Sequence, residues 1–449
     1  MGVGSWELGV KTNSQLLVKN LTKAYYITAE ELASCGVDNI PSQLRSDRHL
    51  VYSSPATLAF NSPGAQGFGV KRAGLAVPES VMLLVAPRCC GRNTAALGHE
   101  QSLADRFYYL LQDDTDIVTG RHLKRISEAV CQICAQRAKK PSAVMICITC
   151  VDALLGTDMD RVCRAASAEA GVPVVPCYMY ALTREGRLPP MASVRDSVYS
   201  LLKKSEKRDS RAVNLLGYFS PIDPESDLFD FLRAAGIRSI NQLSCCQTFD
   251  EYQHMAQANF NLVLNHEARY AAAGLEKRLG MPAIETARFY QPEKIARQYQ
   301  LIAQAIGAQE QTASLIQHSL TNAQSALNDL KEKCGALTFA IGEWCNADPF
   351  ELACALLTYG FKVAEIFGTI GQGNFAFLKK VAALSPNTKI YSNLEPSMIF
   401  YDGNNSEAQI TIGRDAAYYH PAIPNTPWAD EIQPFGFHAV TKLCQSLIR

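Results

Sequence analysis

Short apolar runs alternate with longer amphipathic segments along most of the chain, and no other feature of the sequence constrains the fold as strongly. Residues 81–85, 143–148 and 172–177 are short, apolar and bounded by polar residues, which is typical of buried strands. Between them lie helical patterns such as residues 159–170. Because parallel strands need crossover connections that are usually helical, the alternation predicts an α/β fold with parallel sheets.

The alternation falls into three blocks, and the length of 449 residues agrees with this number at roughly 150 residues per domain. We predict an N-terminal extension over residues 1–45, followed by α/β domains over residues 46–208, 209–330 and 331–449. Apolar residues at helical spacing in residues 309–333 predict a long connecting helix. The expected architecture is three Rossmann-like domains with parallel sheets around a central cleft.

The first domain contains two shorter segments whose patterns we also interpret. We expect a helix over residues 102–111 and a short edge or linking strand over residues 115–120. A longer helix is expected over residues 123–139.

The third domain begins with an expected strand over residues 336–342, followed by a helix over residues 349–359 and a second strand over residues 362–367, which predicts a βαβ unit. A second helix is expected over residues 374–384. Asp348 is expected to cap the first helix, with proline at the first helical position. The glycine-rich loop at residues 368–373 opens the second helix, but its glycines depart from the GxGxxG order of a nucleotide-binding loop.

Charge and hydropathy exclude two classes of function. The chain has 43 basic and 43 acidic residues, whereas a protein that binds nucleic acid or an anionic membrane normally has a basic surplus. No apolar run approaches the ~18 residues of a membrane span. Residues 1–14 lack the apolar core of a signal peptide. We therefore expect a cytoplasmic protein that binds neither nucleic acid nor membranes.

Cys89, Cys90 and Cys150, three of the 15 cysteines, lie just after expected strands. Cys89 and Cys90 follow the strand at residues 81–85, and Cys150 follows the strand at residues 143–148. Open α/β sheets place their ligands beyond the carboxyl ends of the strands. Thiolates gathered there suit iron–sulfur ligation in a reducing compartment, while most other cysteines are expected to fill the core.

Two CxxC pairs, Cys131 with Cys134 and Cys147 with Cys150, suggest a different metal site. Their spacing superficially suits structural zinc. However, the first pair falls in an expected helix and the second at the end of an expected strand, where residues three apart point to opposite faces. We therefore favour iron–sulfur ligation over zinc.

His266 and Glu267 are candidate catalytic residues because they follow another apolar run, residues 259–264. They would contact a substrate or donate a proton. A loop histidine satisfied by its neighbours is the commoner case, and it stays open as the alternative.

Five short segments occur in an order that matches a known family. They are residues 86–91 (APRCCG), 116–120 (DIVTG), 149–158 (TCVDALLGTD), 214–217 (NLLG) and 341–343 (IGE). The third is similar to the motif T-C-x-x-x-L-I-G-D-D, and the first to a Gly-Pro-x-Gly-Cys turn. In these segments the chain resembles the component-1 family of nitrogenases and nitrogenase-like reductases.

The resemblance implies three Rossmann-like domains and a [4Fe–4S] or related iron–sulfur cluster, with Cys90 and Cys150 as ligands and Cys89 as a further one. It also implies a second metallocluster in the cleft or on the partner subunit. The implied partners are a homologous component-1 subunit, or a second copy of this chain, and a dimeric iron protein that hydrolyses ATP.

The sequence departs from the family in two places. Leu58 stands where the first cluster cysteine of the family is expected, so this chain offers fewer thiolates than the one per iron that a [4Fe–4S] cluster takes. The remaining ligands would come from another chain. Residues 261–266 hold no counterpart of the cysteine that binds the large nitrogenase cofactor, so we do not expect this chain alone to reduce dinitrogen.

We therefore expect a subunit of a nitrogenase-like reductase. In this hypothesis a cluster at a subunit interface receives low-potential electrons from the iron protein, and a substrate is reduced in the interdomain cleft. Two alternatives stay open, which are a non-catalytic scaffold for metallocluster assembly and a structural pseudo-subunit that supports a catalytic partner.

Overall fold

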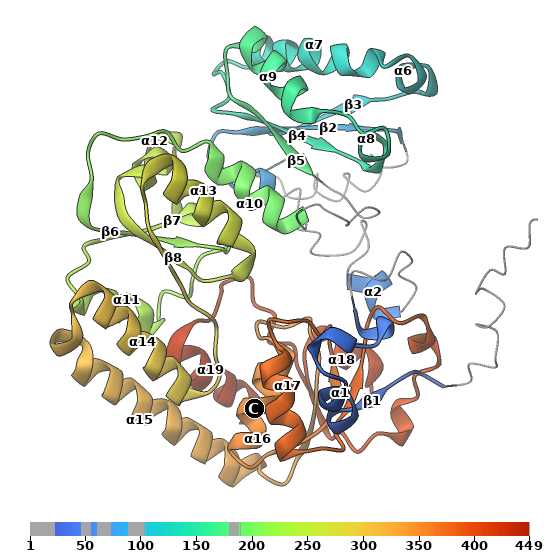
Figure 1. The fold of residues 1–449 in the computed structure, drawn as a ribbon, viewed down its shortest axis with the longest axis vertical. Coiled ribbons are helices and arrows are strands. Elements are labelled where there is room, and N and C mark those ends of the chain that lie inside the picture. The colour runs from blue at the N-terminus through green and yellow to red at the C-terminus, as the bar shows by residue number, and fades with distance from the viewer. Residues whose placement is uncertain are drawn as a thin grey trace, which may run out of the picture.

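The computed structural model of the chain describes residues 23–45, 55–60, 73–88, 103, 105–178, 188 and 190–448. In this part of the chain, three separate sheets of mostly parallel strands each carry their own helices (Figure 1). The predicted α/β class with three Rossmann-like sheets is confirmed. The exact domain boundaries stay a prediction.

The first sheet consists of parallel strands in the order β3-β2-β4-β5. Its elements are β2 (Val81–Ala86), β3 (Phe107–Leu111), α6 (Asp114–Thr119), α7 (Arg121–Gln136), β4 (Val144–Ile148), α8 (Cys150–Leu154), α9 (Met159–Ala170), β5 (Val174–Tyr178) and α10 (Pro190–Ser200). Apolar side chains of β2 and β4 pack against α7 and α9 on one face and against α10 on the other. Because both faces are covered, these strands are buried along their whole length.

Two local predictions in this domain are wrong. The strand expected over residues 115–120 is absent, because Asp114–Thr119 form the helix α6 and Gly120 caps its end. A capping box starts this helix, since the Asp113 side chain accepts a hydrogen bond from Asp116 N (2.7 Å) and the Asp116 carboxylate accepts one from Asp113 N (3.5 Å). Residues 102–111 do not form one helix, because Phe107–Leu111 pairs with β2 as the strand β3.

The second sheet is also parallel, with the order β7-β6-β8-β9. Its elements are β6 (Asp209–Leu216), α11 (Asp227–Ala234), β7 (Ser239–Gln242), α12 (Phe249–His254), β8 (Ala258–Val263), α13 (Arg269–Leu279), β9 (Ala283–Glu285) and α14 (Pro292–Ile306). The helix α13 packs against α10, so one apolar cluster joins the first and second sheets.

The third sheet has the order β1-β12-β11-β10-β13-β14, and only β1 is antiparallel to its neighbour. Its elements are β1 (Ile27–Thr28), α1 (Ala29–Cys35), α2 (Pro55–Phe60), β10 (Thr338–Ile341), α16 (Pro349–Thr358), β11 (Lys362–Phe367), α17 (Phe375–Leu384), β12 (Lys389–Tyr391), β13 (Ile410–Ile412), α18 (Arg414–Tyr419) and β14 (Asn425–Thr426). The predicted βαβ unit is therefore present. Part of the N-terminal extension belongs to this sheet, since β1 pairs with β12 and α1 packs on α17.

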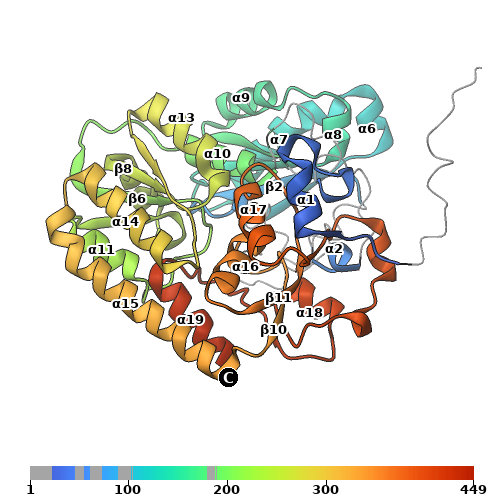
Figure 2. The ribbon, with the colours of Figure 1, turned by 60° about the horizontal axis from the view of Figure 1, so that its bottom comes forward.

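The predicted connecting helix is present as α15 (Gln309–Cys334). It lies along the edge of the molecule beside α14 and the C-terminal helix α19 (Gly436–Ile448) (Figure 2). Its buried side chains join a cluster that includes residues of both the second and third sheets. None of the described helices is long and apolar enough to cross a membrane.

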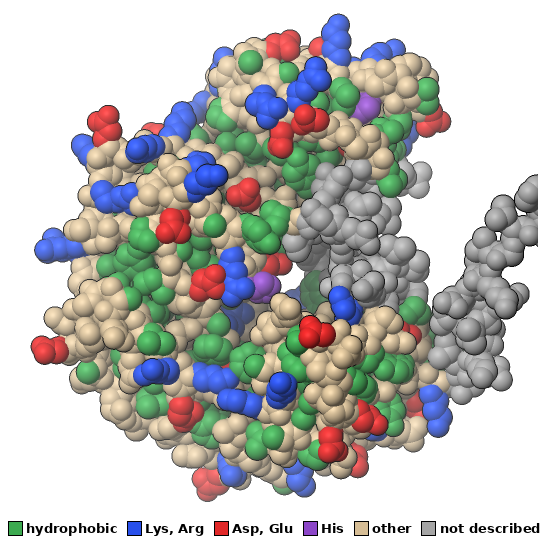
Figure 3. Space-filling model, viewed as in Figure 1, with side chains coloured by type: hydrophobic (Ala, Val, Ile, Leu, Met, Phe, Trp, Pro, Cys, Tyr) green, Lys and Arg blue, Asp and Glu red, His purple; other side chains and the backbone are tan. Residues whose placement is uncertain are grey.

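In each sheet the strand order reverses at one pair of neighbouring strands: β2 with β4, β6 with β8, and β10 with β13. Ligand sites of open α/β sheets lie outside the carboxyl ends of such strands. Gly217, directly after β6, has a φ of 125°, and a Cβ there would lie 2.7 Å from the backbone nitrogen of Asn265. Only glycine fits this close approach. Figure 3 shows the surface hollowed near its middle, between the second and third domains.

Candidate functional site

The cysteines predicted as cluster ligands follow two neighbouring strands of the first sheet in the sequence, β2 and β4. The strands β2 and β4 are parallel and in register, with Val85 opposite Ile148. Cys150 is the first residue of α8, two residues beyond β4. Cys89 and Cys90 lie outside the described residues. Ligation by these cysteines stays a prediction, but the two strands that precede them end at the same sheet edge, at the pair of strands where the strand order reverses.

A buried polar network holds α8 at this edge. Asp152, in α8, is fully buried and lies 3.0 Å through Oδ1 from His122 Nε2. It also accepts hydrogen bonds from Gln112 Nε2 (3.3 Å) and Thr157 Oγ1 (3.2 Å). His122 Nδ1 lies 3.1 Å from the backbone oxygen of Asp116. The network therefore links α8 to the start of α7 and to the end of β3.

Two buried polar atoms at the same edge have no hydrogen-bond partner among the described residues. They are the hydroxyl of Thr149, directly before Cys150, and Oε1 of Gln112. Unpaired buried polar groups are costly and rare, so a partner is expected. The Thr149 hydroxyl, next to Cys150 in the sequence, is able to donate a hydrogen bond to an acceptor such as a thiolate. This donor is compatible with a thiolate-bound iron–sulfur cluster, whose binding here stays a prediction.

The zinc alternative does not fit the structure. Cys131 and Cys134 lie on α7 and belong to the apolar cluster on one face of the first sheet. Cys147 belongs to the cluster on the opposite face, where it is opposite Cys177 of β5. The sheet separates Cys147 from Cys131 and Cys134, so these three cysteines do not surround one metal ion.

His266 and Glu267 begin a short 3-10 helix (His266–Ala268) just beyond β8, as the sequence indicates. The carboxylate of Glu267 lies 2.7 Å from Nη1 of Arg195, which is almost fully buried. Burial lowers the pKa of Arg195, and Glu267 opposes this shift. Glu267 thus stabilises a buried charge. His266 is exposed, and its catalytic role stays a prediction.

The structure also reveals a pair of neighbouring carboxyl groups that the sequence does not predict, with Asp415 buried and Glu343 partly buried. Glu343 follows β10 and Asp415 follows β13, where the strand order of the third sheet reverses. The amide Nδ2 of Asn393 donates hydrogen bonds to Glu343 Oε1 (3.0 Å) and Asp415 Oδ2 (2.7 Å). Burial and the nearby Asp415 raise the pKa of Glu343 to about 7. The pair can therefore hold a proton near neutral pH.

Only a weak signal for this pair exists in the sequence. Glu343 directly follows an apolar strand, but Asp415 is distant in the sequence, and only the sheet order brings the two together. Thr369, in the glycine-rich loop, donates its backbone N–H to Glu343 Oε2 (2.9 Å).

Asp348 caps α16 as predicted, because its Oδ1 accepts hydrogen bonds from the backbone nitrogens of Phe350 and Glu351.

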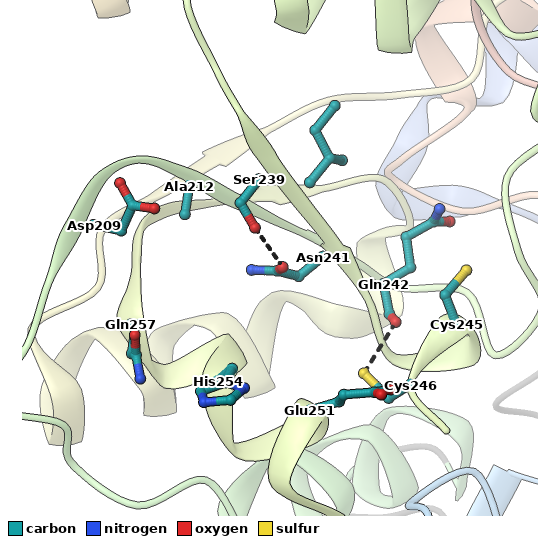
Figure 4. A pocket seen from close by; sticks show the side chains of 11 residues that line it. Asp209, Ala212, Ser239, Asn241, Gln242, Cys245, Cys246, Glu251, His254 and Gln257 are labelled. Carbon is teal, nitrogen blue, oxygen red and sulfur yellow. Dashed lines mark hydrogen bonds between the residues drawn. The ribbon is translucent and has the colours of Figure 1, made fainter. Parts of the chain in front are cut away.

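A cavity of about 430 Å³ lies beside β7, the edge strand of the second sheet (Figure 4). Its lining includes two adjacent cysteines, Cys245 and Cys246, together with Glu251 and His254. Burial raises the pKa of Cys246 to about 11, and Glu251 adds to this effect. The Cys246 thiol therefore stays protonated at neutral pH and is not a ready metal ligand.

Comparison with solved structures identifies the fold. The structure titled "Nitrogenase Cp1 at pH 6.5" superposes with a TM-score of 0.66 at 15% identity, covering 92% of this chain and 96% of that one. "Nitrogenase Cp1 at pH 5" gives a TM-score of 0.62 at 16% identity, covering 91% of this chain and 90% of that one. At this level of identity the similarity concerns the fold.

Sequence comparison finds relatives named for cofactor biosynthesis. The nitrogenase iron-molybdenum cofactor biosynthesis protein NifE of Methanococcus maripaludis is 22% identical over 59% of this chain and 57% of its own length. NifE of Klebsiella pneumoniae is 29% identical over 49% of this chain and 51% of its own length. The nitrogenase molybdenum-iron protein alpha chain of Methanococcus maripaludis is 25% identical over 43% of this chain and 41% of its own.

The chain thus spans about half the length of the curated relatives that it matches. The sequence profile described as "Nitrogenase component 1 type Oxidoreductase" matches residues 65–420, which is most of the chain. The resemblance seen in the short motifs is therefore confirmed, and the chain belongs to the family of nitrogenase component 1 type oxidoreductases.

Proposed function

We propose that this chain is a scaffold subunit on which a metallocluster is assembled and from which it is passed on. The observation that carries the proposal is the match to relatives named as iron-molybdenum cofactor biosynthesis proteins. This function is the alternative in the sequence-based hypothesis, and the comparisons favour it over the reductase.

The thiol inventory supports the same proposal. Cys90 and Cys150, with Cys89 as a further ligand, would hold an iron–sulfur cluster, which when bound can store and transfer single electrons. Leu58, in α2, offers no thiolate where the family is expected to have one. A cluster with one ligand fewer from this chain is held less tightly, which suits transfer to another protein.

The surroundings of Cys150 support a partner subunit. Val118 on α6 is 86% exposed, and Leu154 and Leu155 at the end of α8 are 67% and 52% exposed. Both helices lie at the same end of the first sheet (Figures 1 and 2). The partner is a homologous component-1 subunit or a second copy of this chain, and it would cover these side chains and complete the ligand set. An ATP-dependent iron protein would supply electrons.

A reductase subunit is the second candidate function. It is favoured by the position of His266, an exposed histidine between the second and third domains. Burial raises the pKa of Asp348 in the third domain, and the charge of His266 opposes this shift, so the two groups are within electrostatic reach. In a reductase, His266 would donate a proton to a substrate in the cleft.

The deciding experiment measures iron, acid-labile sulfide and cluster transfer on anaerobically purified protein, expressed with a homologous component-1 subunit. Cys90→Ser and Cys150→Ser are compared with Cys245→Ser, which alters an exposed cysteine of the second domain. The scaffold function predicts iron and sulfide in the wild type and in Cys245→Ser, and their loss in the other two variants. It also predicts that the cluster moves to an apo-acceptor protein.

Each result separates the candidate functions. Turnover that requires the iron protein, ATP and dithionite, without loss of cluster, contradicts the scaffold and supports the reductase. Iron-free protein that is indifferent to both cysteine substitutions contradicts both functions and leaves a structural subunit.

A further inference from the structure

Two segments far apart in the sequence meet between the second and third domains. One is the loop at residues 221–226, and the other leads into α19. The backbone nitrogen of Asp223 donates to the oxygen of Gln433 (2.9 Å), and the nitrogen of Gln433 donates to the oxygen of Pro221 (2.8 Å). The nitrogen of His438 donates to Oδ1 of Asp227 (2.7 Å). These contacts fix the two segments relative to each other.

Three side chains that can ligate a metal ion converge at this junction. His438 Nε2 lies 3.6 Å from Asp223 Oδ2 and 3.7 Å from Glu225 Oε2. These distances are too long for hydrogen bonds. Nε2 of His438 is nevertheless buried, and it has no hydrogen-bond partner in the described part of the chain. A buried imidazole nitrogen therefore faces two carboxylates without being satisfied by either.

We propose that Asp223, Glu225 and His438 bind a divalent first-row metal ion such as Mn²⁺. The ligand atoms all lie within 4.8 Å of one another. Mn²⁺ prefers octahedral sites, in which two neighbouring ligand atoms about 2.1 Å from the ion are about 3.0 Å apart. The separations of 3.6 and 3.7 Å would therefore shorten by about 0.6 to 0.7 Å when the ion binds. One imidazole and two carboxylates suit borderline to hard divalent ions.

Lys442 is the natural competitor for this site. Its Nζ lies 2.8 Å from Asp223 Oδ2 and 3.9 Å from Asp430 Oδ2. A bound divalent ion would repel the ammonium group, and Asp430 offers the displaced lysine a second carboxylate. Lys442 therefore lowers the affinity for the metal without abolishing it. Because the ligands come from both segments, the ion would tie the loop at residues 221–226 to α19.

The test uses the full chain, stripped of metal and titrated with Mn²⁺, while the electron paramagnetic resonance signal of free Mn²⁺ is followed. Mn²⁺ is chosen because it prefers carboxylate and imidazole to the thiols of the 15 cysteines. Glu225→Gln changes a side chain that is 81% exposed, so folding is not at risk. Lys442→Met removes the competitor. Glu276→Gln, an exposed residue on α13, is the matched control.

We expect the wild type and Glu276→Gln to bind one equivalent of Mn²⁺ with the same Kd. The Kd should rise about tenfold or more in Glu225→Gln and fall about tenfold in Lys442→Met. Bound Mn²⁺ should show nitrogen coupling from an imidazole, and it should raise the thermal midpoint of the wild type by mass action.

Absence of binding in the wild type overturns the proposal, even if Lys442→Met binds, and so does an unchanged Kd in Glu225→Gln. Binding without nitrogen coupling overturns the assignment of His438. Because the readout is Mn²⁺ binding, the result does not depend on whether the chain is a scaffold or a reductase.

Discussion

At the scale of single residues, the carboxyl groups of Glu343 and Asp415 lie close together where they are shielded from water, and each is negatively charged when ionised. Hydrogen bonds from Asn393 and from the backbone nitrogens of Glu343 and Trp344 satisfy their oxygens. Burial raises the pKa of both groups, and for Glu343 the value reaches about 7. The folded protein therefore keeps a proton there that the unfolded chain releases near the ordinary value of 4.5.

This proton makes the stability fall as the pH rises. Below pH 4.5 both states are protonated, and above about pH 7 the folded state has lost the proton too, so the contribution is lost between these values. At about 1.4 kcal/mol per pKa unit, the loss is about 3 kcal/mol. In Glu343→Gln the free energy of unfolding, measured with urea from pH 4.5 to 8, should fall less over this range. Glu332→Gln, exposed on α15, should match the wild type. Parallel curves for Glu343→Gln and the wild type would contradict the assignment.

Asp152 is a second residue whose environment gives a clear prediction. Asp152→Ala leaves His122, Gln112 and Thr157 without their shared acceptor in a buried site. The expected loss in the free energy of unfolding is about 3 kcal/mol, because unpaired buried polar groups keep their full desolvation cost. Iron content should also fall, since the network positions the helix that begins with Cys150. Asp160→Ala, exposed on α9, is the control. Unchanged urea midpoints in Asp152→Ala would show that the network is dispensable.

At the scale of elements, the close contact between β10 and β13 depends on Gly342. A Cβ at this position would lie 2.0 Å from Oδ1 of Asp415, whose carboxylate is held in place by backbone nitrogens. Gly342→Ala should lower the free energy of unfolding by about 3 kcal/mol or more. Gly371→Ala, where a Cβ meets nothing within 4 Å, should change it by less than about 1 kcal/mol. Equal stability of the two variants by urea unfolding would refute the close packing.

Strong local patterns are enough to predict most elements of this fold. The elements expected over residues 159–170, 309–333 and 362–367 agree with the structure within one residue, because apolar spacing and length agree there. The segment expected as a strand over residues 115–120 is helical, because the Asp113 capping box outweighs its β-branched residues. The strand Phe107–Leu111 does not follow from its local pattern, because only pairing with β2 decides between strand and helix.

The candidate site is less predictable than the elements. Strand ends indicate where Cys90 and Cys150 lie, because ligands of parallel sheets gather there. They do not indicate Glu343 with Asp415, or Glu225 with His438, since these pairs meet only through long-range packing. The sequence disfavours a zinc site, and the structure excludes it, because Cys134 and Cys147 lie on opposite faces of one sheet.

At the scale of the whole molecule, the three sheets form one body through shared helices. The contact of α10 with α13 joins the first and second sheets, and α14, α15 and α19 join the second to the third. At the carboxyl edge of the first sheet, the apolar side chains of Val118, Leu154 and Leu155 are exposed. Exposed apolar groups that gather at one end of a domain mark a surface for another protein.

Association through this edge can be tested directly. Leu154→Glu combined with Leu155→Glu places two charges in the proposed interface, and a leucine that becomes buried contributes about 2 kcal/mol. We expect the double variant to weaken association with a second copy, or with a homologous component-1 subunit, by at least about tenfold in sedimentation velocity. Leu384→Glu alters a leucine of similar exposure, 52%, at the end of α17 on the third domain, and it should leave the association unchanged. If the double variant assembles as the wild type does, the interface lies elsewhere, and a cluster held by Cys150 would not be shared between subunits at this edge.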